Sequence, residues 1–257
     1  MLDTPALLLR SGIGGPAAGD YLRLHPATAV SAIYDGRPQK GWWGPPQSGL
    51  SMEYANIEDG YGYLIETSHS SPGVAGSALP WAGGADHKEL MSRSAETASF
   101  VLLLRDRGHG RVSIDKAGRA VHEYAMTDEL DDRLFRRGLV ELCRLHELAG
   151  ADRIVTFHRA VDPWLRGSGE AFADFATRVH DAPLTPYEHA TFSLHHMGSA
   201  RMGKDPATSV ANPWGELHDT PGVWIGDGSA FPTASGTNPM LTIMALARRT
   251  AEAIAAA

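Results

Sequence analysis

The sequence contains a single cysteine, Cys143, among its 257 residues. An internal disulfide needs two cysteines, so a fold held together by disulfide bonds is excluded. Basic residues are also in deficit, because 23 Lys and Arg stand against 30 Asp and Glu, for a formal net charge of −7. Proteins that bind nucleic acid usually carry a basic face. The composition therefore argues against nucleic acid as a partner.

Long hydrophobic runs are absent as well. No apolar stretch approaches the roughly 20 residues that a membrane-spanning helix needs. The N-terminus lacks the basic region and apolar segment of a secretory signal. The chain is nevertheless 43% hydrophobic, enough for a sizeable core, and its length corresponds to one large or two modest domains. We expect a soluble globular protein without a membrane-spanning segment, located in the cytoplasm.

The most informative stretch runs from His195 to the C-terminus. The apolar run 223–225 predicts a short buried strand, and Asp227 follows at its end. Asn238 and Pro239 predict the start of a helix, because Asn is a favoured N-cap and Pro suits the first helical position. Ligands often bind beyond the ends of strands and at helix N-termini. The pattern fits a nucleotide cofactor or, equally well, an ordinary packed strand, loop and helix.

A second glycine-rich stretch lies near the N-terminus. Thr4 as N-cap and Gly12 as a stop predict a short apolar helix over residues 4–11. The following residues 12–17 have the spacing G-x-G-x-x-A of a dinucleotide-binding loop, which requires a preceding strand and a following helix. Here a helix precedes the motif, and no clear helix follows Pro16. We interpret this stretch as a glycine-rich turn.

The middle of the chain predicts an antiparallel α+β layer, because a run of strands is followed by a hairpin and then by helices. Strands are expected over 28–34, 61–67, 99–105 and 154–157, with a hairpin over 110–124. Helices are expected over 87–94, 127–149 (capped by Thr127) and 169–179, with a long loop over 68–86. No metal-ligand spacing such as H-E-x-x-H or paired cysteines occurs.

The C-terminal motifs together resemble the signature of the glucose–methanol–choline (GMC) flavin oxidoreductases. The matching residues are His195-x-x-Gly198-Ser199, Arg201-Met202-Gly203, Asp227-Gly228-Ser229, Phe231-Pro232 and Asn238-Pro239. Residues 23–28 and 196–203 further resemble the branch of the family that acts on long-chain or other primary alcohols. The resemblance implies an antiparallel substrate domain over 28–190. It also implies a partial FAD-domain segment over 1–27, and an active-site loop with the last strand and helix of the FAD domain over 191–257.

The same resemblance implies FAD as the cofactor and an alcohol CH–OH group as the site of oxidation by hydride transfer. His195 matches the catalytic base, a role that suits a side chain with a pKa near neutrality. His196 lies one residue out of register and is the alternative. Asn238 matches the second catalytic position. The cofactor-binding residues implied by the resemblance are Asp227, Gly228, Asn238, Pro239 and Met240, with the helix N-terminus near the anionic edge of the reduced ring.

The resemblance does not extend to the family's N-terminal nucleotide-binding half. Three hypotheses follow from the sequence. The chain could be half of a split flavoenzyme completed by a second polypeptide, a truncated and inactive product, or a non-enzymatic binding domain that reuses the substrate fold. We also expect the last helix to pack against residues 4–11 and 223–226 and to leave apolar surface exposed, because its sheet partners would be missing.

Overall fold

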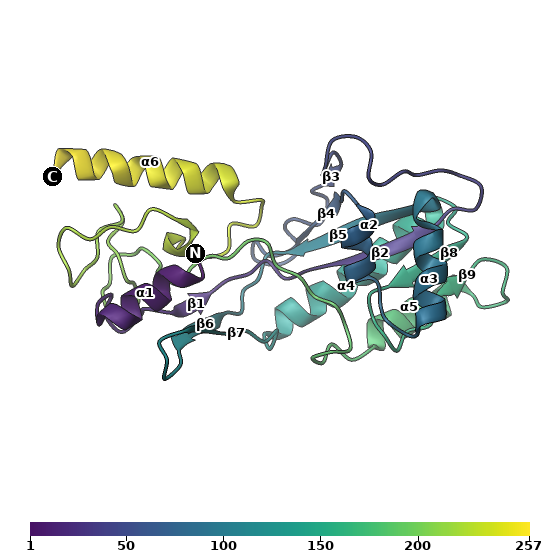
Figure 1. Ribbon diagram of the computed structural model, residues 1–257, viewed down its shortest axis with the longest axis horizontal. Coiled ribbons are helices and arrows are strands. Elements are labelled where there is room, and N and C mark those ends of the chain that lie inside the picture. The colour runs from purple at the N-terminus through teal and green to yellow at the C-terminus, as the bar shows by residue number, and fades with distance from the viewer. The chain divides into compact units, whose positions relative to one another are not determined.

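The structure is a computed structural model that describes residues 1–257. The chain forms two compact units, which Figure 1 shows with both termini in the first. Unit 1 comprises Met1–His25, Arg105–Asp131 and Ser193–Ala257, and unit 2 comprises Pro26–Leu104 and Asp132–Phe192. None of the helices has the length and apolar character needed to cross a bilayer.

Unit 2 is built on a six-stranded antiparallel sheet with the order β3-β4-β5-β2-β8-β9. Its strands are β2 (Ala27–Ile33), β3 (Leu50–Ser51), β4 (Tyr63–Thr67), β5 (Thr97–Leu104), β8 (Arg153–Thr156) and β9 (Trp164–Leu165). The central strand β2 is buried at every position. Because successive side chains of a strand point to opposite faces, this burial requires cover on both faces of the sheet.

Helix α4 (Glu129–Leu148) covers one face. The ring of His146 lies 4.5 Å from that of Phe100 on β5. Gly138 allows α4 to approach closely, because a Cβ at this position would lie 2.4 Å from the Leu102 side chain. Phe100 and Leu102 are two residues apart, so both point to the face that α4 covers.

Helix α3 (Gly84–Ser92) covers the opposite face of the sheet, where its Leu90 packs against Ile33 and Val155. Ile33 lies three positions after Val30, the partner of Phe100, and an odd number of positions along a strand places its side chain on the other face. The remaining helices of unit 2 are α2 (Pro72–Ala78), the 3₁₀ turn η1 (Ser94–Glu96) and α5 (Phe172–Asp181). The antiparallel α+β fold expected from the sequence is therefore confirmed.

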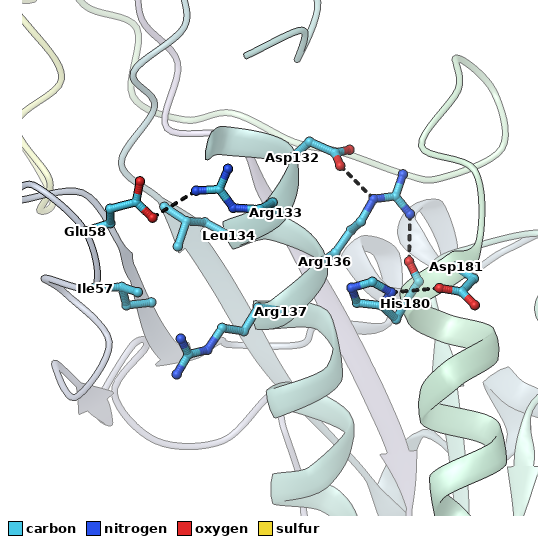
Figure 2. A pocket seen from close by; sticks show the side chains of 9 residues that line it. All are labelled: Ile57, Glu58, Asp132, Arg133, Leu134, Arg136, Arg137, His180 and Asp181. Atoms are coloured by element: carbon cyan, nitrogen blue, oxygen red, sulfur yellow. Dashed lines mark hydrogen bonds and ion pairs between the residues drawn. The ribbon is translucent and has the colours of Figure 1, made fainter. Parts of the chain in front are cut away.

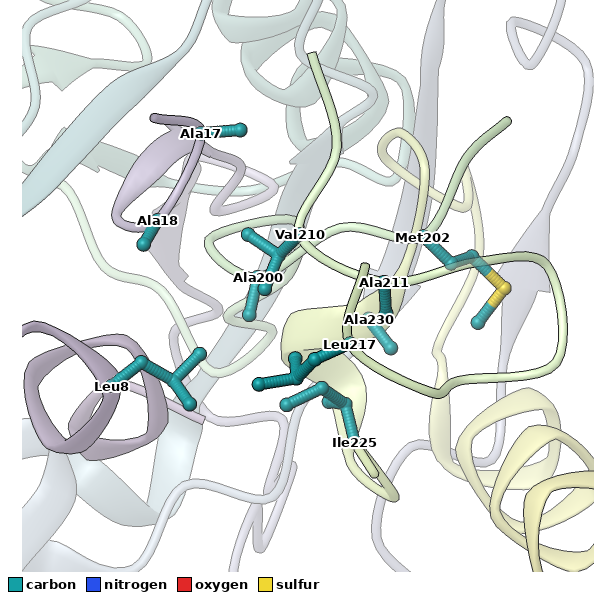
Figure 3. Packing of buried hydrophobic residues seen from close by; sticks show 10 residues of the cluster. All are labelled: Leu8, Ala17, Ala18, Ala200, Met202, Val210, Ala211, Leu217, Ile225 and Ala230. Carbon is teal, nitrogen blue, oxygen red and sulfur yellow. The ribbon is translucent and has the colours of Figure 1, made fainter. Parts of the chain in front are cut away.

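Unit 1 contains a small antiparallel sheet of β1 (Asp20–Leu22), β6 (Gly110–Ile114) and β7 (Ala120–Glu123). Its other elements are α1 (Asp3–Ser11), the 3₁₀ turn η2 (Gly228–Ala230) and α6 (Met240–Ala256). The core between them is rich in alanine, so backbone segments approach closely (Figure 3). Its buried members are Leu8, Ala17, Ala18, Ala200, Met202, Val210, Ala211, Leu217, Ile225 and Ala230.

Helix α6 has one packed and one exposed side. Leu246 packs against the alanine-rich core that contains Leu8 and Ile225, as expected from the sequence. Four large apolar side chains are exposed, with fractions of 66% for Met240, 72% for Leu241, 52% for Met244 and 49% for Ile254. The expected apolar exposure is therefore confirmed.

Several local predictions are wrong. Thr4 does not cap α1, because the helix begins at Asp3 with Leu2 at the N-cap position. The expected loop 68–86 contains α2 and the start of α3, because Ser71 caps α2 by accepting a hydrogen bond from Val74 N–H. The cap of α4 is not Thr127, because the carboxylate of Asp128 accepts the N–H groups of Leu130 and Asp131. The expected strand 223–225 is absent, since a single bridge between Glu216 and Trp224 is its only ladder pairing.

The domain boundaries expected from the sequence differ from those of the two units mainly in one segment. The sequence assigned all of 28–190 to the middle domain, whereas the hairpin of β6 and β7, within Arg105–Asp131, belongs to unit 1. The assignment of 1–27 and 191–257 to a flavin-binding domain, and of 28–190 to a substrate domain, stays a prediction.

Buried and half-buried histidines make the stability of both units depend on pH. In unit 2, burial lowers the pKa of His146 and of His189 to about 4 from an ordinary value of 6.5. In unit 1, burial and the charges of His195 and Arg105 lower the pKa of His25 to about 3. Between pH 6.5 and 4 the unfolded chain therefore binds protons that the folded chain does not, and stability is lost as the pH falls through this window.

We expect the free energy of unfolding to fall by about 1.4 kcal/mol per pH unit for each of these histidines between pH 6.5 and 4. Denaturation by urea at a series of pH values measures this slope. His146→Gln should reduce the slope, because it removes one of the three groups. His122→Gln is the matched control at an exposed position of β7, and it should leave the slope unchanged. A slope that is equally steep in both variants would contradict the prediction.

Candidate functional site

The glycine turn that follows α1 already holds a carboxylate. The backbone N–H groups of Gly14 and Gly15 both donate to Oδ2 of Asp219, each at 2.9 Å. Phosphate-binding loops use such consecutive N–H groups to hold their anion. Here the protein's own Asp219 takes that place, so the interpretation of the stretch as a turn is confirmed.

Asp227 anchors α1 to the turn η2. Its Oδ2 accepts a hydrogen bond from Thr4 Oγ1 at 2.5 Å, and its Oδ1 accepts the backbone N–H and the hydroxyl of Ser229 at 2.7 Å and 2.5 Å. Burial favours a raised pKa, but the hydrogen bonds from Ser229 and Thr4 outweigh it, so the pKa of Asp227 is lowered. The next residue, Gly228, is buried. Asp227 thus has a clear structural role, and no strand precedes it.

The adjacent rings of His195 and His196 differ in how they are held. Nδ1 of His195 lies 3.2 Å from Nδ1 of His25, with the two ring planes at 87°. The other nitrogen of His195, Nε2, has no protein partner, and the His196 ring makes no hydrogen bond within the chain. Burial lowers the pKa of both rings, and the charge of His196 lowers that of His195 further. The structure therefore fixes His195 through one nitrogen and leaves the other free to meet a ligand.

His25 belongs to the site although the sequence analysis did not identify it. It is fully buried, and its Nε2 accepts the backbone N–H of Gly236 at 3.0 Å. Gly236 lies two residues before Asn238, so His25 joins the loop of His195 to the loop of Asn238. These contacts span 170 and 211 residues of sequence. A local sequence pattern cannot predict contacts between residues so far apart in sequence. The only sequence feature that pointed to His25 was its position in the stretch 23–28, which resembles a branch of the family.

A buried carboxylate fixes the backbone of His25. Asp106 accepts the N–H of Leu24 at 2.9 Å, the N–H of His25 at 3.1 Å and the hydroxyl of Tyr124 at 3.0 Å. His25 has a φ of +46°, in the left-handed region that few residues other than glycine adopt. Such conformations persist where the surroundings determine them, and they cluster at functional sites.

The start of α6 differs by one residue from the sequence prediction. The helix begins at Met240, and Pro239 rather than Asn238 occupies the N-cap position, where no side chain caps it. The Pro239 carbonyl accepts the first helical hydrogen bond, from Ile243 N–H at 2.8 Å. Asn238 is half-buried, and no hydrogen bond of its side chain within the chain is found. The Asn238 amide and the first N–H groups of α6 thus lack side-chain partners and are free to bind a ligand.

Unit 2 carries an open cavity of about 740 Å³ between the start of α4 and the end of α5 (Figure 2). Its lining residues are Ile57, Glu58, Asp132, Arg133, Leu134, Arg136, Arg137, His180 and Asp181. Most of its charges pair with one another, as in the ion pairs of Arg133 with Glu58 and of Arg136 with Asp132, each at 2.8 Å. No site residue expected from the sequence lines this cavity, and we do not assign the chemistry to it.

Comparisons with known proteins agree on one family. A profile described as GMC oxidoreductase matches residues 106–247, more than half of the chain. A long-chain-alcohol oxidase of Arabidopsis thaliana is 31% identical over 96% of this chain. An uncharacterized GMC-type oxidoreductase of Mycobacterium tuberculosis is 32% identical over 97% of it. The chain spans only 35% and 38% of the lengths of these two relatives.

The fold is shared with solved structures as well. A formate oxidase of Aspergillus oryzae superimposes with a TM-score of 0.67 at 15% sequence identity. The match covers 99% of this chain and 52% of the oxidase. At this identity the likeness concerns the fold alone, and it extends over both units of the chain.

Proposed function

Because this chain belongs to the GMC oxidoreductase family, we propose that it forms the substrate-side part of an FAD-dependent alcohol oxidoreductase. The reaction removes a hydride from a CH–OH carbon and the proton from its hydroxyl group. Similarity to a long-chain-alcohol oxidase supports a primary alcohol as the substrate class. The observation that carries the proposal is the linked set of His195, His25 and Gly236, which holds one histidine nitrogen unpaired beside the loop of Asn238.

FAD is the cofactor that the family assignment supports, and the residues of unit 1 fit one part of it. The uncapped start of α6, from Met240 onward after the N-cap residue Pro239, offers free N–H groups and the positive end of a helix dipole to the anionic edge of the ring. Asn238 supplies an unpaired amide. Gly228 lies near the first turn of α6, since a Cβ at this position would be 3.3 Å from the Ile243 side chain. Its neighbour Asp227 is already hydrogen-bonded to Ser229 and Thr4. When bound, the flavin ring supplies the acceptor for the hydride.

The protein side chains then act on the alcohol oxygen. We assign His195, through its unpaired Nε2, and Asn238, through its amide, as the catalytic residues that hydrogen-bond this oxygen. The resemblance gives His195 the role of the base. A general base or acid in such a position contributes typically on the order of 10²–10⁴ in rate.

The phosphate-binding part of the site is proposed to come from outside these residues. Asp219 already occupies the amides of the glycine turn, and the relatives are about three times as long as this chain. We propose that the additional part of the relatives covers the exposed apolar side of α6, whether it stands in the same polypeptide or in a second chain. A truncated product or a binding domain that reuses the fold is the alternative.

The first prediction concerns the cofactor. We expect this chain alone to bind FAD weakly or not at all, because its glycine turn has no free N–H groups for the pyrophosphate. Titration of the purified chain, followed by flavin fluorescence, measures the affinity. Tight binding of one FAD per chain would show that the phosphate site lies within these residues.

The second prediction concerns His195 in a completed enzyme, made by fusing or co-expressing this chain with the matching N-terminal part of a long-chain-alcohol oxidase. His195→Ala should slow flavin reduction by about 10²–10⁴ while the flavin stays bound. His196→Ala is the matched control, because its ring makes no hydrogen bond in the chain, and it should have a much smaller effect. Rapid mixing with alcohol under anaerobic conditions measures both rates. The reverse order of effects would move the assignment to His196, and no effect from either would exclude this chemistry.

The third prediction separates catalysis from stability at Asn238. Asn238→Ala should leave thermal unfolding nearly unchanged, within about 0.5 kcal/mol as for surface substitutions, because Asn238 does not cap α6. Flavin reduction in the completed enzyme should nevertheless slow. Asn238→Asp should slow it further, since its negative charge opposes charge that develops on the oxygen and on the ring. A large loss of stability in Asn238→Ala, with reduction unimpaired, would mean that the residue is structural.

A further inference from the structure

The direction of the hydrogen bond between the two buried histidines follows from a third group. A backbone N–H can only donate, so the bond from Gly236 requires a lone pair on Nε2 of His25. The pKa of His25 is lowered to about 3 by burial and by the charges of His195 and Arg105, which keeps the ring neutral near pH 7. A neutral imidazole carries one proton. That proton must therefore lie on Nδ1 of His25.

The proton on His25 in turn determines which nitrogen of His195 is protonated. Nδ1 of His25 faces Nδ1 of His195 at 3.2 Å. Because the His25 nitrogen carries the proton, it donates, and Nδ1 of His195 accepts. His195 is held neutral near pH 7 by burial, which lowers its pKa. Its single ring proton then lies on Nε2, the nitrogen without a protein partner.

We infer that His25 is a positioning residue that fixes the tautomer of His195, so that His195 presents an Nε2–H donor at the site. The opposite tautomer would turn the Nδ1 proton of His195 toward His25. His25 would then either lose both ring protons or point an Nε2–H at the N–H of Gly236. The first is chemically excluded near neutral pH and the second sets two donors against each other.

This assignment changes the expected role of His195, in a way that rests on the proposed function. A base at Nε2 needs a lone pair there, and the observed network places a proton on that nitrogen instead. His195 therefore meets the alcohol oxygen as a donor, which stabilises negative charge on that oxygen as a preorganised hydrogen bond. The hydroxyl proton then leaves to a water molecule at the completed site rather than to Nε2 of His195. The tautomer itself is a property of this chain and needs neither cofactor nor substrate.

The backbone that carries the His25 ring is held in place by a buried carboxylate. Asp106 holds the N–H groups of Leu24 and His25, and His25 is fully buried in a left-handed conformation. Tyr124 donates to the same carboxylate. The backbone of His25 is thus fixed by Asp106, while the contacts of its ring with Gly236 and His195 orient the ring and the Gly236 N–H sets the direction of the hydrogen bond between the two histidines.

The test is nuclear magnetic resonance of this chain with ¹⁵N-labelled histidine at pH 7. Long-range ¹H–¹⁵N correlation distinguishes the protonated from the unprotonated nitrogen of each neutral ring. Signals are assigned by their loss in His25→Gln and His195→Gln, and exposed His122 serves as an internal reference. We expect Nδ1–H for His25 and Nε2–H for His195. An Nδ1–H tautomer of His195 would overturn the inference.

Two variants test the role of His25 itself. His25→Phe keeps the ring volume but removes both nitrogens, so His195 should change from one tautomer to a mixture. His25→Gln can accept from Gly236 through its oxygen and donate to His195 through its nitrogen, and it should restore the Nε2–H form. If His195 stays wholly in the Nε2–H form in folded His25→Phe, His25 is not the positioning residue. If His25→Phe does not fold, the unaltered chain and His25→Gln still decide, because an Nδ1–H form of His195 in either contradicts the inference.

The outcomes also separate this inference from the proposed function. Expected tautomers together with an inactive completed enzyme would leave the inference intact and refute the function. An Nδ1–H form of His195, together with a large loss of flavin reduction in His195→Ala, would support the function and refute the inference.

Discussion

The carboxylate of Asp106 is the interaction on which unit 1 depends. It lies in the second of the three chain segments that form this unit, and it binds the backbone of Leu24 and His25 in the first. The ring of His25 then reaches His195 and Gly236 in the third. A buried carboxylate without partners would be costly, and here its acceptor positions are used to join segments that are distant in sequence. The arrangement of the residues in the candidate site therefore depends on the buried carboxylate of Asp106.

The sequence predicted those elements whose signals are local. The signals for β2, for the apolar strand β5 and for the hairpin of β6 and β7 were readable because each depends on neighbouring residues. The same holds for the left-handed Gly12 that ends α1. Errors arose where two local signals competed. Asp128 capped α4 in place of the adjacent Thr127, and Pro239 took the N-cap position expected for Asn238. The strand expected at 223–225 failed because a strand also needs a neighbour with which to pair, and only one bridge is present.

The candidate site was predictable only in part, for the same physical reason. His195 and Asn238 were found through a resemblance of motifs, whereas His25 and Asp106 act through contacts that no spacing rule describes. The structure also gives Asp227 and the glycine turn tasks of their own, since Asp227 binds Thr4 and Ser229, and Asp219 fills the turn. The part of the site that would face substrate is thus completed by internal hydrogen bonds. The glycine turn, which has the spacing of a phosphate-binding loop, is closed by the carboxylate of Asp219.

The contact between Thr4 and Asp227 joins residues 223 positions apart, and the one between Gly14 and Asp219 joins residues 205 apart. Closing such long loops costs entropy before the contacts form, and high contact order slows folding. During synthesis on the ribosome, α1 and its apolar side must wait until Asp219 and Asp227 have emerged. Unit 1 is therefore the part of the protein that completes its folding last, and the nascent α1 is the segment most exposed to aggregation and to chaperones in the meantime.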